Sequence, residues 1–328
     1  MMQSPGISTI ESTLKKRMNM HITILGITVL SLLIALIINR MFFLRGIIHI
    51  GLGTVLVISI EWGYLWLKKQ PVSFKQYELW VQPINTALLI ALLTPVRATY
   101  TVLILAVVFT YLSKYIMQWL FQRQIINPIV LGLIGSQLLL GQRLNISETF
   151  LSLFEGQLSD FSYWQLLFGL YEGFSISSTV FIFLAFAAGY LIISKAIDSM
   201  IFTHTMVHLI VWTVLIALLT SLSFPVVFNM IWLGPAAFTL VFLIPDMPST
   251  PEIKESRIIY AFLVVWVYVF FRIQFGLIPA AFFSLAISQL VMWITERFFT
   301  RTHKRYQKMI VAIMIVLYAL IILRLLVA

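Results

Sequence analysis

The chain has 328 residues, of which 61% are hydrophobic and 10% charged. A soluble domain has roughly 45–50% apolar and about 25% charged residues, so this chain cannot cover a globular surface with polar side chains. The composition excludes a soluble enzyme, a nucleic-acid-binding protein and a disordered protein, and it is typical of a protein that crosses a membrane several times. The sequence has no cysteine, which excludes disulfides and thiolate metal ligands.

In chain order, a polar lead-in of residues 1–20 comes first, and the apolar run behind it is long enough to be a full span rather than a cleaved signal peptide. Eleven apolar segments follow the pattern of spans: 21–39, 42–66, 81–94, 98–120, 125–141, 177–197, 205–224, 226–245, 257–275, 277–297 and 309–327. The third and the fifth are short, because a crossing helix needs about 20 apolar residues. We predict an all-α integral membrane protein with 10 or 11 transmembrane helices.

The loop charges predict an orientation for these spans. With the N-terminus in the cytoplasm, 16 of the 22 Lys and Arg residues fall on the cytoplasmic side and 6 on the other. Because Lys and Arg collect in cytoplasmic loops, we interpret the net charge of +10 as orientation rather than as a nucleic-acid surface. The expected location is the cytoplasmic membrane of a bacterium, with the N-terminus inside.

Polar landmarks of the chain recur at a fixed distance. Pro83, Pro95, Pro128 and Ser136-Gln137 recur as Pro235, Pro245, Pro279 and Ser288-Gln289, at offsets of 150 to 152 residues. Each helix of the first copy and its counterpart in the second copy lie five spans apart along the chain. Because five is an odd number, the two copies cross the membrane in opposite directions. The pattern predicts an inverted repeat, as is common in transporters. The expected parts are a lead-in (1–20), a first five-helix repeat (21–141), an extracytoplasmic segment (142–176), a second inverted repeat (177–297), and a basic loop with an extra C-terminal helix (298–328).

The short segments predict broken helices and a site between them. Asn127-Pro128 and Pro279 lie where helices begin, and half-helices are tolerated at membrane depth only inside protein or beside a cavity. Their free N–H ends suit anionic or carbonyl-bearing ligands. Uncharged polar side chains near these ends are the candidate binding residues: Asn85, Asn127, Ser136, Gln137, Ser288 and Gln289. Such side chains also serve simply to hold helices together, and that alternative stays open.

Charged residues inside spans are the other candidates. Glu61 lies within 42–66, where a buried charge is costly, so a place on an ion or proton path or in an ion pair is the first hypothesis. The alternative is an interfacial position beside Trp62. Lys114 is interpreted as snorkelling to the membrane surface. His204 and His208 share one helix face, but no carboxylate is in register with them, so no metal site is predicted.

Several of these segments resemble one family of membrane proteins. The stretch from Asn85 to Pro95, then Asn127-Pro128 with Leu131-Gly132, and above all Asp246-Met247-Pro248-Ser249-Thr250-Pro251 with Arg257 behind it, follow the family's order and spacing. The chain is similar, over roughly residues 4–300, to the membrane proteins RnfD of the Rnf complex and NqrB of the sodium-pumping NADH:quinone reductase. The resemblance implies ten spans in two inverted halves, flavin binding, partner subunits and ion-coupled electron transfer. It also adds Asp246, Thr250 and Arg257 to the candidate cofactor-binding residues.

One departure from the family pattern shapes the functional hypothesis. The family carries FMN esterified to the Thr of a Ser-Gly-Ala-Thr element, and no Gly-Ala-Thr occurs in this sequence. Covalent FMN is therefore not expected. The leading hypothesis is a membrane subunit of an electron transport complex that uses a non-covalent flavin or a quinone, with no catalytic residue of its own assigned. The alternatives are a transporter or channel for a small polar or anionic solute, and a structural scaffold for partner subunits.

Overall fold

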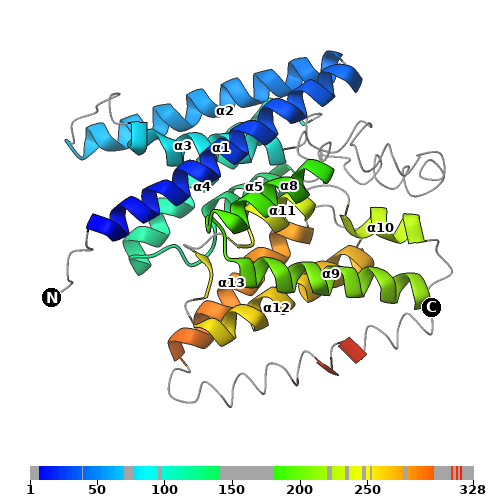
Figure 1. The fold of residues 1–328 in the computed structure, drawn as a ribbon. Helices are drawn as coiled ribbons and strands as arrows, with labels where there is room; N and C mark the ends of the chain where they lie inside the picture. The colour runs from blue at the N-terminus through cyan, green and yellow to red at the C-terminus, as the bar shows by residue number, and fades with distance from the viewer. Residues whose placement is uncertain are drawn as a thin grey trace.

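A computed structural model describes most of the chain, and the part that it describes is helical, without strands (Figure 1). The described residues are 7–38, 40–69, 77–94, 98–140, 181–219, 224–232, 236–245, 249–251, 253–275, 280–298, 312, 315–316 and 318–319. The all-α membrane class predicted from the sequence is confirmed. The extracytoplasmic segment 142–176 and most of the last span, 309–327, lie outside the described residues.

The helices follow one another in two groups along the chain. The first group is α1 (Ile7–Ile38), α2 (Arg40–Leu67), α3 (Tyr77–Leu93), α4 (Tyr100–Phe121) and α5 (Pro128–Leu140). The second group is α8 (Phe181–Ile193), α9 (Ser199–Leu219), α10 (Phe224–Trp232), α11 (Ala236–Phe242), α12 (Lys254–Phe275) and α13 (Ala280–Phe298). The opposite insertion of the two groups, and the limits of the two repeats, stay predictions.

Length and composition separate the described helices into two kinds. Five of them, α1, α2, α4, α9 and α12, contain segments long and apolar enough to cross a membrane. Shorter apolar helices occur at Trp80–Leu93, Pro128–Leu139 and Ile182–Ile193. The first two of these correspond to the third and fifth expected segments, whose shortness the sequence predicted.

Three helices or helix limits differ from the sequence prediction. Helix α9 begins at Ser199 rather than 205, because the carboxylate of Asp198 accepts hydrogen bonds from the backbone N–H groups of Met200 (3.0 Å) and Ile201 (3.1 Å). These bonds satisfy donors that a helix start leaves without intrahelical partners. The single span expected at 226–245 is described as two short helices, α10 and α11. Helix α1 also begins within the expected lead-in and continues unbroken into the first span.

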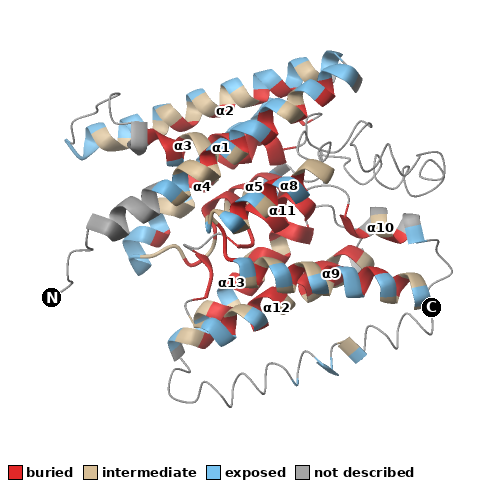
Figure 2. Cartoon of the chain, in the orientation of Figure 1, coloured by how far each residue is buried: buried red, intermediate tan, exposed pale blue. Residues whose placement is uncertain are grey.

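The helices pack with the second group beside the first. Helices α1 and α2 lie together at one edge, α9, α12 and α13 lie toward the opposite edge, and α5, α8 and α11 lie between them (Figure 1). Every residue of α11 is buried, which makes this short helix the centre of the core (Figure 2). Large apolar side chains on the outer faces of α1, α2 and α9 are exposed, as expected of surfaces that face lipid.

Helices α4 and α5 approach each other closely at Gly132. A Cβ atom added there would lie 2.4 Å from the backbone oxygen of Ala106 and 2.0 Å from the Thr110 hydroxyl oxygen. The contact involves backbone, which cannot move aside like the end of a flexible side chain. Only glycine lets the short helix α5 pack this close to α4.

We predict that Gly132→Ala destabilises the protein, by about 1–3 kcal/mol or more, because the added methyl overpacks a backbone contact. The measurement is the midpoint of thermal unfolding of the purified protein in detergent. Gly26→Ala is the matched control, since a Cβ at Gly26 in α1 meets nothing within 4 Å. The control should be neutral or slightly stabilising, by up to about 1 kcal/mol. Equal midpoints for the two variants would contradict the prediction.

Candidate functional site

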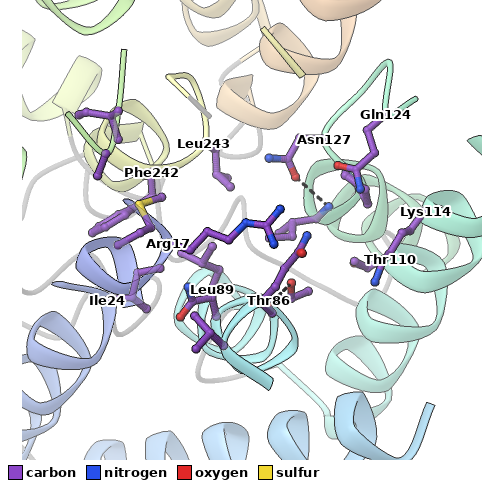
Figure 3. Close-up of a pocket in the computed structure, with 18 of the residues that line it drawn as sticks. Arg17, Ile24, Thr86, Leu89, Thr110, Lys114, Gln124, Asn127, Phe242 and Leu243 are labelled. Atoms are coloured by element: carbon purple, nitrogen blue, oxygen red, sulfur yellow. Dashed lines mark hydrogen bonds between the residues drawn. The ribbon is translucent and has the colours of Figure 1, made fainter. Parts of the chain in front are cut away.

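A pocket of about 240 Å³ lies where the two groups of helices meet. Its walls come from α1, α3, α4, the start of α5, the connection before α9 and the end of α11 (Figure 3). The described lining residues are Lys16, Arg17, Met20, Ile24, Val81, Gln82, Asn85, Thr86, Leu89, Thr110, Lys114, Gln124, Asn127, Pro128, Ile129, Ala196, Ile197, Phe242 and Leu243. The pocket therefore combines apolar walls with a few polar and basic groups, the usual make-up of a small-molecule site.

Three basic side chains line this pocket, and none of its described lining residues is acidic. Lys16 and Arg17 come from the first turns of α1, and Lys114 comes from α4. The Arg17 side chain extends across the pocket toward Asn127, and Lys114 lies beside Thr110 on another wall (Figure 3). The pocket consequently presents positive charge to whatever enters it.

Glu61 forms an ion pair with Lys114, which connects this candidate residue to the pocket wall. The Tyr115 hydroxyl also donates to the Glu61 carboxylate, at 3.3 Å, and Tyr64 stacks on the Tyr115 ring with centroids 4.1 Å apart. Glu61 is buried, so an ion pair accounts for a charge at this depth, as one sequence hypothesis proposed. The sequence interpretation of Lys114 as a snorkelling side chain did not include Glu61 as its partner. A role of Glu61 on an ion or proton path stays a prediction.

The two candidate asparagines both line the pocket. The side-chain oxygen of Asn85 in α3 lies 2.5 Å from His21 Nδ1 of α1, in a hydrogen bond between the two helices. The side-chain oxygen of Asn127 accepts from the backbone N–H of Ile129 (3.0 Å), which caps the start of α5. Pro128 has no N–H to satisfy, so it fits at this first helical position.

Gln289 of α13 joins the start of α5 to the second group of helices. Its side-chain oxygen accepts from the backbone N–H of Asn127 (2.8 Å), across 162 residues of sequence. Its side-chain nitrogen donates to the hydroxyls of Ser249 (2.9 Å) and Tyr260 (3.3 Å). One buried amide therefore connects α5, the segment after α11, and α12. This arrangement matches the holding role left open from the sequence, directly behind the pocket.

The segment most similar to the family pattern lies on this junction rather than in the pocket lining. Thr250 is buried next to Ser249, and Arg257 donates to the Asp198 carboxylate (2.7 Å) and to the backbone oxygen of Pro251 (3.1 Å). These contacts tie the start of α12 to the start of α9. Asp246 lies outside the described residues. The cofactor role of these residues stays a prediction.

Three other candidates are buried away from the pocket lining. Ser136 and Gln137 lie in the second half of α5, and Ser288 lies beside Gln289 in α13. The side-chain oxygens of Gln137 and Ser288 have no hydrogen-bond partner in the described part of the chain. The two Ser-Gln pairs, alike in sequence, thus make different contacts, and the structure does not bring all predicted binding residues into one site.

The sequence predicts Lys16 and Arg17 only as orientation charges, yet both line the pocket. Arg17, Met20 and Ile24 are spaced three and four residues apart, so they share one face of α1, on which Ile24 is buried and Arg17 is exposed. That spacing is a signal that places Arg17 on the pocket wall. The depth of Glu61 and Lys114 is another such signal. They lie six and seven residues before the ends of α2 and α4, helices that run in the same direction across the membrane by the predicted topology.

No cluster suited to a metal ion occurs among the described residues. The rings of His204 and His208 stack with centroids 6.3 Å apart in α9, but no group of three or more histidine or carboxylate side chains gathers anywhere in the described part.

A comparison with protein families matches residues 8–305, most of the chain, to the NQR2, RnfD, RnfE family. The chain belongs to this family. Members of the family are membrane subunits of Na⁺-NQR or Rnf complexes. Membership in the family therefore places the chain in a membrane and in association with other subunits. No curated protein matches the chain. The family suspected from the sequence is confirmed.

We predict that Gln289→Ala destabilises the protein by about 1–3 kcal/mol, because it leaves the buried N–H of Asn127 without its acceptor. The thermal unfolding midpoint in detergent measures the effect. Gln118→Ala is the matched control, since the Gln118 side chain is exposed on α4, and it should leave the midpoint unchanged. A Gln289→Ala variant as stable as the control would show that the amide does not join the two groups of helices.

Proposed function

We propose that this chain is a membrane subunit of an ion-coupled or flavin-based electron transport complex and that its central pocket binds a non-covalent flavin or a quinone. The observation that carries this proposal is the pocket itself, which lies where the two groups of helices meet and begins at the N-terminal end of α5. Family membership supports the complex, and the pocket supports a ligand within this chain.

The chemistry of the lining fits a conjugated ring with carbonyl groups. Amide and hydroxyl side chains of Asn85, Thr86 and Asn127 provide donors and acceptors for ring carbonyls and ring nitrogens. Apolar side chains of Leu89 and Phe242 provide contact for the flat faces of the ring. The volume of about 240 Å³ lies slightly below the ~300–1,000 Å³ common for ligand pockets. It therefore suits one ring system or one polar group, with the rest of the ligand extending outward.

A flavin or quinone bound there supplies the electron-accepting chemistry. The protein's own residues bind and orient the ligand through the amides, and the apolar walls restrict the access of water. Covalent attachment is not part of the proposal, and the segment 142–176, in which the sequence offers only isolated hydroxyl side chains, lies outside the described residues.

The loop charges support a cytoplasmic N-terminus, and the proposed location is the cytoplasmic membrane of a bacterium. In that orientation the pocket opens near the cytoplasmic side, because Lys16 and Arg17 belong to the first turns of α1. A ligand at this depth is accessible to a cytoplasm-facing partner protein that donates or accepts electrons.

A second candidate function is transport of a small anionic solute without redox chemistry. The three basic residues of the pocket favour it, because a basic pocket attracts anions whatever their redox behaviour. Solute uptake by proteoliposomes that contain the chain alone separates the two functions, since an isolated electron-transport subunit has no partner that would drive uptake.

We predict that Thr86→Phe abolishes flavin or quinone binding, because the added ring fills the pocket from the wall formed by α3. The purified chain is titrated with riboflavin, followed by quenching of flavin fluorescence, and with a short-chain quinone, followed by calorimetry. Thr101→Phe is the matched control, because Thr101 is exposed on α4 and does not line the pocket. The proposed site would be contradicted if the unmodified chain bound neither riboflavin nor the quinone. It would also be contradicted if the two variants bound the ligand with equal affinity.

A further inference from the structure

We infer that the pocket binds the phosphate group of an anionic ligand and that Glu61 competes with this phosphate for Lys114. The inference rests on the proposed function for the identity of the pocket, and it adds the chemical class of what the pocket holds. The two sources of such a group in a membrane protein are a phosphorylated flavin, FMN rather than riboflavin, and the headgroup of an anionic lipid.

The pocket carries a net positive charge. Lys16, Arg17 and Lys114 contribute three positive charges to a volume of about 240 Å³, and no described lining residue is acidic. Like charges that line one pocket repel one another, and an anion bound in the pocket relieves that repulsion. A neutral ring such as a quinone or the flavin ring system does not supply that anion.

The donors around the pocket suit a phosphate group. The exposed side chain of Arg17 extends across the pocket toward Asn127 (Figure 3). An arginine fork binds phosphate oxygens through two parallel hydrogen bonds, and lysines add point charges. The start of the 13-residue helix α5, at Pro128, forms another part of the wall, but its first N–H groups already have acceptors within the protein. The positive groups therefore come from two elements, α1 and α4.

The net charge of the pocket matches that of a phosphate monoester. Lys114 is paired with Glu61, which lies in α2 outside the lining, so the charge left in the pocket is close to +2. A phosphate monoester carries about −1.5 to −2 charges at pH 7 and matches this value. A carboxylate, or the phosphodiester of a lipid such as phosphatidylglycerol, carries one negative charge and leaves one cation uncompensated, so the charge balance favours the monoester of FMN.

Lys114 is shared between Glu61 and the pocket. Lys114 faces Glu61 and Tyr115 on one side and the pocket on the other, and its ammonium also lies 4.9 Å from the centroid of the Tyr111 ring. An anion in the pocket draws the ammonium away from Glu61, and the Glu61 carboxylate in turn weakens the attraction for that anion. By linkage, removal of the Glu61 charge strengthens phosphate binding, and bound phosphate weakens the ion pair between Glu61 and Lys114 by the same free energy.

The test uses the purified full-length chain in nanodiscs of zwitterionic phosphatidylcholine, titrated with FMN and with riboflavin by fluorescence quenching. FMN should bind at least about tenfold more tightly than riboflavin, because it alone makes charge-assisted hydrogen bonds to the basic groups. Arg17→Gln should weaken FMN binding about tenfold and leave riboflavin binding unchanged, and Arg17→Lys should lose less. Glu61→Gln should strengthen FMN binding.

Lys15→Gln is the matched control, because Lys15 is the exposed neighbour of Lys16 and does not line the pocket. It changes the net charge as Arg17→Gln does and should leave FMN binding unchanged. In a second arm, part of the lipid is replaced by phosphatidylglycerol, and lipid retained by the detergent-purified chain is quantified by native mass spectrometry. Retention that falls in Arg17→Gln, without any preference for FMN, assigns the phosphate to a lipid headgroup.

The outcomes separate this inference from the proposed function. Equal affinities for FMN and riboflavin, together with lipid retention that does not depend on Arg17, would overturn the phosphate site, even where Thr86→Phe still abolishes flavin binding. Phosphate binding that depends on Arg17 in a chain that binds neither flavin nor quinone supports the site and contradicts the proposed redox role. Unchanged FMN affinity in Glu61→Gln would overturn the competition for Lys114.

Discussion

The arrangement depends on one constraint, that a helix which begins inside a membrane protein must find partners for its first N–H groups without water. Helix α5 meets it in three ways. Pro128 has no N–H, Asn127 caps Ile129 with its side chain, and Gln289 from the other group of helices accepts the N–H of Asn127. The second group of helices therefore completes the start of α5. The pocket lies beside that start, so the contact that satisfies the backbone also places the candidate site.

Two buried carboxylates, Asp198 and Glu61, follow the same logic of compensation. Asp198 caps α9 and pairs with Arg257 of α12, and Glu61 of α2 pairs with Lys114 of α4. Each pair joins helices that are not consecutive in the chain, so each restrains the relative position of two elements. The two pairs differ in their surroundings. Arg257 also binds the backbone of Pro251 and belongs to the framework, whereas Lys114 also faces the pocket and can respond to what the pocket holds.

The sequence predicts the helices well because long apolar runs have one stable form in a membrane, and it predicts short helices where prolines interrupt those runs. It does not predict which polar residues meet. Gln137 and Gln289 occupy equivalent places in the proposed repeat, yet Gln289 makes three hydrogen bonds and the Gln137 oxygen finds no partner in the described part. That difference arises from contacts between residues more than 100 positions apart, such as Asn127 and Gln289, which no local pattern records. Depth, by contrast, could have indicated the Glu61 pair, and helix-face spacing could have placed Arg17 beside Met20 and Ile24 on the pocket wall.

Without a Gly-Ala-Thr element, the retention of a flavin depends on the residues of the pocket. A flavin held by an ester bond stays in place whatever its affinity, whereas a flavin held without a bond depends on the free energy of its contacts. In a pocket of about 240 Å³ the apolar walls alone supply little of that free energy, because much of a three-ring ligand remains outside. Charge-assisted hydrogen bonds to a phosphate add about 1.5–3 kcal/mol each to that free energy. Basic residues in the pocket are therefore what a family member without covalent attachment would need to retain a flavin at the junction of its two groups of helices.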